Sequence, residues 1–196
     1  MIDTTDRQTR RRCNMDTERL GIELGDLICE TCGESIEEID DIISTLGRMN
    51  LVFLEYIALL LWTATKVASN VLPEKSFQHA SDIAFSVTFD FLNTIENLRD
   101  HPEFNMNKYE EFIHDRFEQY YGAWKDYPNP FDEDNEKVKR NFSVVLCFIR
   151  CCFADTAENL EFENKDYSVL VDKAWEVVGH HYFRFVERIR SVLSRF

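Results

Sequence analysis

The chain has 196 residues, with 22 Lys and Arg against 36 Asp and Glu, and a formal net charge of −14. Hydrophobic residues make up 44% and charged residues 30%, which is typical of a soluble globular protein and excludes a disordered tail or a collagen. Six Gly and four Pro are too few for a turn-rich β-sandwich. The length is that of one domain with a full core.

The charge is unevenly distributed along the chain. Residues 1–12 contain four Arg and two Asp, so removing them from the 22 basic and 36 acidic residues leaves 18 and 34, a net charge of −16. Residues 13–196, which we call the body, are acidic enough to repel a phosphate backbone. We therefore expect no direct phosphate binding to nucleic acid. The body would attract basic partners, and imitation of nucleic acid stays open. Residues 1–15 predict a mobile polar arm and residues 16–196 a single all-helical domain.

The pattern of apolar residues predicts an all-α, single-domain bundle of about six or seven helices. The first helix begins near Asp16 and ends near Gly33. Ser35 and Glu38 form a capping box for a second helix that stops near Gly47. Further helices are expected over about 49–71, 76–98, 107–124, from the acidic residues at 132–136 onward, and from 165 to the C-terminus.

The segment 49–71 is apolar nearly all round, which predicts a central helix surrounded by others. Glu55 and Lys66 interrupt Leu51–Leu72, and the uncharged stretch Tyr56–Thr65 is too short to cross a bilayer. No apolar run directly follows the basic residues 10–12, as a signal peptide would require. We therefore expect a cytoplasmic protein that does not bind membranes.

The C-terminal segment carries an apolar seam over 32 residues. A straight helix of that length is about 48 Å long, whereas a compact domain of this size is only about 40 Å across. Either Gly179 bends this long helix or one end projects towards a partner. The seam predicts a protein partner or self-association through the C-terminal helix, including a homodimer.

The cysteines do not form a complete metal motif. Cys29 and Cys32 make one C-x-x-C pair, whereas a structural zinc site usually needs a second pair. Cys147 and Cys151 lie four residues apart in an apolar segment, where thiols commonly fill a core. Free thiols are therefore expected, and metal binding by Cys29 and Cys32 stays open.

No catalytic site, metal site or cofactor is predicted. Glu111 and His114 form a single Glu-x-x-His, whereas a carboxylate-bridged dinuclear site needs two. Adjacent helical positions diverge by about 100°, so His180 and His181 are poor joint ligands. Motifs of Ser hydrolases, P-loops, dinucleotide-binding folds and zincins are absent from the sequence.

Glu55 is the most informative single residue, because a buried carboxylate needs a partner. An arginine from another helix, Arg99, Arg116 or Arg150, would supply one. Alternatively, Glu55 lines an aromatic ligand cavity. The residues expected around that cavity are Glu55, Tyr56, Phe85, Phe89, Tyr120 and Trp124.

These features favour a non-enzymatic, acidic regulatory or adaptor protein that acts through helix–helix contacts. The first alternative is a binder of small hydrophobic ligands with its cavity around Glu55. The second is a metal enzyme that uses Glu111 and His114.

Overall fold

A computed structural model describes residues 4–43, 49–95, 105–125, 143–152 and 165–196, with side chains for these ranges except 4–15, 36–37, 39–43, 49–51 and 165–172. Six helices and no strand occur in these ranges, which confirms the all-α bundle. They are α1 (Thr4–Ile43), α2 (Met49–Ser69), α3 (Glu74–Leu92), α5 (Met106–Lys125), Ser143–Cys152, and α7 (Lys165–Leu193).

The first two expected helices are a single helix, α1. Gly33 does not end it, and the Ser35 hydroxyl donates to the Thr31 carbonyl oxygen (2.6 Å) inside the helix instead of capping a new one. The prediction of a break was wrong because buried residues continue at helical spacing across Gly33. These buried residues are Leu24, Leu27, Ile28, Thr31, Cys32 and Ser35.

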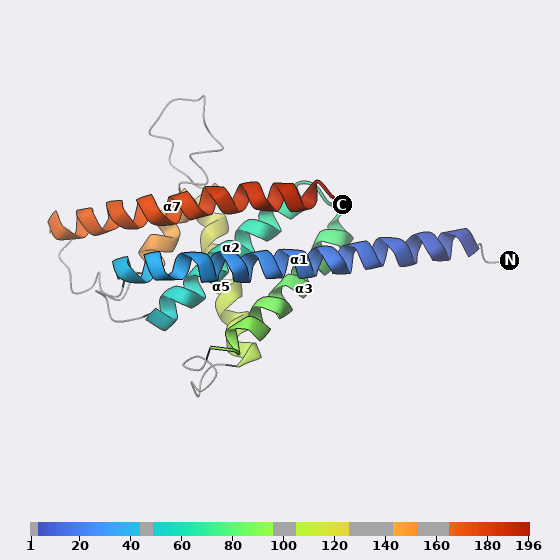
Figure 1. The fold of residues 1–196 in the computed structure, drawn as a ribbon, viewed down its shortest axis with the longest axis horizontal. Coiled ribbons are helices and arrows are strands. Elements are labelled where there is room, and N and C mark those ends of the chain that lie inside the picture. The colour runs from blue at the N-terminus through green and yellow to red at the C-terminus, as the bar shows by residue number, and fades with distance from the viewer. Residues whose placement is uncertain (1–3, 44–48, 96–104, 126–142, 153–164) are drawn as a thin grey trace, which may run out of the picture.

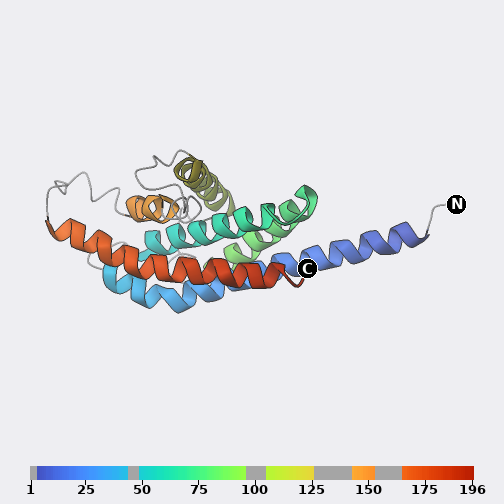
Figure 2. The same cartoon turned by 90° about the horizontal axis from the view of Figure 1, so that it is seen from above.

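The start of α1 also differs from the prediction. The helix begins at Thr4 instead of Asp16, so it runs through the segment expected to be a polar arm. Figures 1 and 2 both show the N-terminal part of α1 projecting beyond the other helices, past the C-terminal end of α7. The division into an arm and a domain stays a prediction.

Helix α2 lies at the centre, as its composition predicts. It packs against α1, α3, α5 and α7, and residues 55–64 are all buried. The stretch Val52–Ser69 is long and apolar enough to cross a membrane by length and composition, but 67% of it is buried inside the bundle. A core helix has the same properties, so the cytoplasmic location stays a prediction.

Helices α1 and α3 pack closely because small residues line their contact. A Cβ added to Gly21 would lie 2.8 Å from the Ala80 carbonyl oxygen, and one added to Gly25 would lie 2.6 Å from the Val87 Cβ. The two glycines face Ile83 and Val87 of α3, which are also four residues apart. The absence of a side chain at Gly21 and Gly25 thus allows the two helices to approach each other.

The remaining boundaries follow the prediction with two exceptions. Helix α3 ends at Leu92 instead of near Leu98, and α2 ends at Ser69, before Pro73, which precedes the first turn of α3. Helix α5 agrees within one residue at each end, and α7 begins at Lys165 as expected. The acidic residues 132–136 and Arg99 lie outside the described residues.

Candidate functional site

Glu55 of α2 has its expected arginine partner, which is Arg116 of α5. The Arg116 Nε lies 2.7 Å from both carboxylate oxygens, and its Nη2 lies 2.5 Å from Oε1. The Glu55 side chain is fully buried, and that of Arg116 is 20% exposed. Of the other two candidates, Arg150 is exposed and Arg99 is not described.

Glu55 and Arg116 form an ion pair between a buried carboxylate and a partly exposed guanidinium, and this environment shifts both pKa values. Burial raises the pKa of the Glu55 carboxyl, and the hydrogen bonds and charge of Arg116 oppose that rise. The pKa of Arg116 is raised by its bonds to Glu55, although its own burial acts in the other direction. The guanidinium supplies the donors that the carboxylate needs, so Glu55 does not require a ligand to be stable in the core.

Tyr120 and Tyr56 are fully buried near Glu55 but make different contacts. The Tyr120 hydroxyl lies 3.4 Å from the Glu55 carbonyl oxygen, and its ring packs edge-on against Trp62. The Tyr56 hydroxyl lies 3.4 Å from Ser35 Oγ of α1, and its ring lies against Phe148. Tyr120 thus connects α5 to α2, and Tyr56 connects α2 to α1 and to the helix Ser143–Cys152.

The other three expected cavity residues lie elsewhere on α3 and α5. Phe85 and Phe89 pack against the ring of Tyr109, with centroid distances of 4.9 and 5.5 Å. Trp124 lies under the Lys66 ammonium, whose nitrogen is 4.0 Å from the ring centroid. The structure thus distributes the six residues over three contact groups. The ligand cavity around Glu55 stays a prediction.

The histidine and carboxylate motifs fall on exposed surfaces. His114 pairs with Glu118 (3.6 Å) and Glu111 with Lys108 (3.1 Å), all four within α5. No three His, Cys, Asp or Glu side chains among those the structure describes come close enough together to hold a metal. Glu111 and His114 are therefore without a third ligand in the described ranges.

Ion pairs connect α1 to α7 along one side of the bundle. Arg188 of α7 contacts Glu30 and, at 3.2 Å, Glu34 of α1, and Arg195 lies 2.8 Å from Glu23. His181 of α7 is largely buried, and its Nε2 lies 2.9 Å from a carboxylate oxygen of Glu38. The sequence gives no sign of these pairings, since the partners are more than 140 residues apart.

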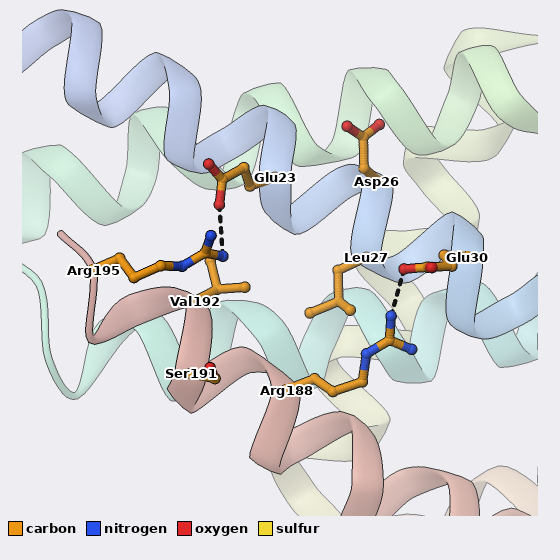
Figure 3. Close-up of a pocket in the computed structure, with 8 residues that line it drawn as sticks. All are labelled: Glu23, Asp26, Leu27, Glu30, Arg188, Ser191, Val192 and Arg195. Carbon is orange, nitrogen blue, oxygen red and sulfur yellow. Dashed lines mark hydrogen bonds and ion pairs between the residues drawn. The ribbon is translucent and has the colours of Figure 1, made fainter.

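A groove of about 340 Å³ lies between the two helices at this point. Figure 3 shows its walls, with Arg188 of α7 and Arg195 just beyond the end of α7 reaching to carboxylates of α1. Its lining residues are Glu23, Asp26, Leu27, Glu30, Arg188, Ser191, Val192 and Arg195. Because both arginines already pair with glutamates in the groove walls, the arrangement fastens α7 to α1.

The apolar seam of α7 is covered within the chain. From Ala174 onward its residues are buried in the bundle, and Phe196 at the end is 44% exposed. The buried seam residues are Ala174, Val178, Tyr182, Phe185, Ile189 and Val192. The buried seam was the main reason for expecting self-association through α7, and that self-association stays a prediction.

Two features of α1 were not predicted from the sequence: its close contact with α3 and its length. The Gly21-x3-Gly25 spacing was the available signal for the close α1–α3 contact. The unbroken helical spacing through residue 35 was the signal for one long α1. The comparisons with known proteins add no family or fold, since no family model, curated protein or solved structure matches the chain.

Proposed function

We propose that the chain is a non-enzymatic regulatory or adaptor protein that binds acidic helical surfaces through the projecting part of α1. A second copy of the chain provides such a surface. The observation that carries this proposal is the projection of the N-terminal part of α1 beyond the bundle.

The projecting segment differs from the rest of the chain in charge. Residues 4–15 contain four Arg and one Asp, a net charge of +3, next to a strongly acidic body. A helix of twelve residues is about 18 Å long. That length allows the arginines to reach a surface while the two acidic bodies stay more than a Debye length of about 10 Å apart in 0.1 M salt.

The exposed side of α5 is the acceptor we propose in the second copy. Glu110, Glu111, Asp115 and Glu118 are exposed there, the last three at spacings of four and three residues. Arg7 and Arg11 in α1 are also four residues apart. Two helices with matching charge spacing can lie side by side and pair their charges.

The affinity of such a contact is limited by the modest strength of exposed ion pairs. Four pairs of at most about 1 kcal/mol each give about 4 kcal/mol, which corresponds to a Kd near 1 mM. In a two-fold dimer each copy docks on the other. The two contacts together give at most about 8 kcal/mol, so the lowest Kd expected is about 1 μM. Association is therefore expected between about 1 μM and 1 mM, and only at low salt.

Sedimentation equilibrium of the full chain over that concentration range tests the proposal. In 50 mM salt we expect a reversible dimer that dissociates at 500 mM salt. The variant Arg10→Gln/Arg11→Gln/Arg12→Gln should be monomeric. The control Arg150→Gln/Arg184→Gln/Arg190→Gln removes three exposed arginines elsewhere and should still dimerise.

Charge exchange identifies the acceptor. Arg10→Glu/Arg11→Glu should abolish the dimer, and adding Glu111→Arg/Glu118→Arg to the same chain should restore it. A wild-type chain that stays monomeric up to 1 mM in low salt would overturn the proposal. Retention of a labelled 20-base-pair DNA duplex more tightly than a second copy would also overturn it, in favour of phosphate binding.

A further inference from the structure

Two cysteines lie one helical turn apart at the edge of the bundle, beside α5. Cys147 and Cys151 belong to the helix Ser143–Cys152, and both are only partly buried. The Cys151 Sγ lies 3.2 Å from Gln119 Oε1, and the Cys147 Sγ lies 3.9 Å from the Gln119 carbonyl oxygen. Both thiols thus face the same residue of α5.

The two thiols differ in acidity because they interact with each other. A hydrogen bond from Cys151 lowers the pKa of Cys147, and the charge of Arg150 acts in the same direction. The bond to Cys147 raises the pKa of Cys151, as does its burial. The pKa of Cys147 therefore lies below that of Cys151.

The C-x-x-C pair of α1 is less accessible. Burial raises the pKa of Cys29 to about 11 and also raises that of Cys32. Cys32 is fully buried. Because the core encloses Cys32, an ion does not reach both thiols, and this pair is a poor ligand set although its spacing resembles a metal motif.

The spacing of Cys147 and Cys151 suits a bridging ion better than a direct disulfide. Residues four apart on a helix have Cβ atoms about 5–6 Å apart, whereas a disulfide needs about 3.5–4.5 Å. An ion bonded to both sulfurs at about 2.3 Å each separates them by up to about 4.6 Å. The ion therefore spans the gap without distortion of the helix.

We propose that Cys147 and Cys151 form a two-thiolate site for a soft monovalent metal ion, with Cu(I) as its preferred occupant. Thiolates select Cu(I) among the common metals, whereas zinc requires four ligands and the described residues offer no third one here. Binding replaces two S–H bonds by two S–Cu bonds and releases two protons. The affinity for Cu(I) therefore rises with pH. This site does not depend on the contact proposed for α1.

Anaerobic competition for Cu(I) against a chromophoric chelator, together with native mass spectrometry, tests the site in the full chain. We expect one Cu(I) per chain and an affinity at least about tenfold higher at pH 8 than at pH 6. Cys147→Ser and Cys151→Ser should each lower the affinity by about 100-fold, the upper end of the loss on removal of a metal-site partner. Cys29→Ser, in the other pair, should bind as the wild type does.

Alkylation of the wild type provides a test that needs no variant. Cu(I) should protect Cys147 and Cys151 from iodoacetamide, and peptide mapping should show Cys29 labelled equally with and without the ion. Unchanged Cu(I) affinity in Cys147→Ser, or loss of affinity in Cys29→Ser, would overturn the assignment. Rapid formation of a Cys147–Cys151 disulfide with full helicity would also overturn it, because the spacing argument would then be wrong.

Discussion

Replacing Arg116 with Met tests whether the buried carboxylate of Glu55 depends on its ion pair. The change removes three contacts of 2.5–2.7 Å from a fully buried group. Breaking a buried pair by removing one partner costs about 3–5 kcal/mol. Tyr120 still donates to Glu55, so we expect the lower end, about 3 kcal/mol, at pH 7.5. For a chain of this length that loss lowers Tm by about 6–12 °C.

The loss of unfolding free energy in Arg116→Met should become smaller as the pH falls. The folded-state pKa of Glu55 is raised above its ordinary value of 4.5, and removing Arg116 raises it further. The ionised carboxylate destabilises the fold above the folded-state pKa, and this destabilisation diminishes as the pH falls towards 4.5. The difference in unfolding free energy between variant and wild type should therefore be smaller at pH 5.0 than at pH 7.5.

Urea unfolding followed by circular dichroism measures both effects. The double variant Glu55→Met/Arg116→Met should be within about 1 kcal/mol of the wild type or more stable, because no charge is left unpaired. Arg150→Met, at an exposed position on another apolar helix, should change stability by less than about 0.5 kcal/mol. A loss below 1 kcal/mol in Arg116→Met, or a double variant as unstable as the single one, would refute the reasoning.

Two further stability predictions rest on local packing. Gly25→Ala should destabilise the fold by about 1–3 kcal/mol, since its Cβ would meet Val87 at 2.6 Å. Gly33→Ala, in the same helix with no atom within 4 Å, should instead stabilise it by about 0.5–1 kcal/mol; equal effects in thermal melts would contradict the close α1–α3 contact. Tyr109→Phe removes the 3.0 Å hydrogen bond to Thr88 and should cost about 1 kcal/mol in urea unfolding, whereas an unchanged midpoint would show that this buried bond contributes nothing.

The fold could be predicted from sequence because the apolar residues recur at helical spacing. The central place of α2 follows from its apolar surface, and the need of Glu55 for an arginine follows from the cost of burying a charge. The identity of that arginine could not be predicted, because Arg99, Arg116 and Arg150 all satisfy the same electrostatic condition. Only the packing of α5 against α2 selects Arg116.

Features that depend on tertiary packing were not accessible from the local pattern. Ser35 and Glu38 match a capping box, but burial of residues on both sides of Gly33 favours a continuous α1. The seam of α7 has the same appearance whether its neighbour belongs to the same chain or to another. In the described part of α7 it is covered by the chain itself, so the candidate contact surface shifts to α1.

Photo-cross-linking from the projecting part of α1 tests the proposed assembly most directly. p-Benzoylphenylalanine placed at Gln8 would be irradiated in an equal mixture of light and isotopically heavy chains at 50 mM salt. We predict cross-linked peptides that join light to heavy chains, with the second site on α5 near Glu111 or Glu118. Cross-links confined to single chains, or an unchanged yield at 500 mM salt, would contradict the proposed contact.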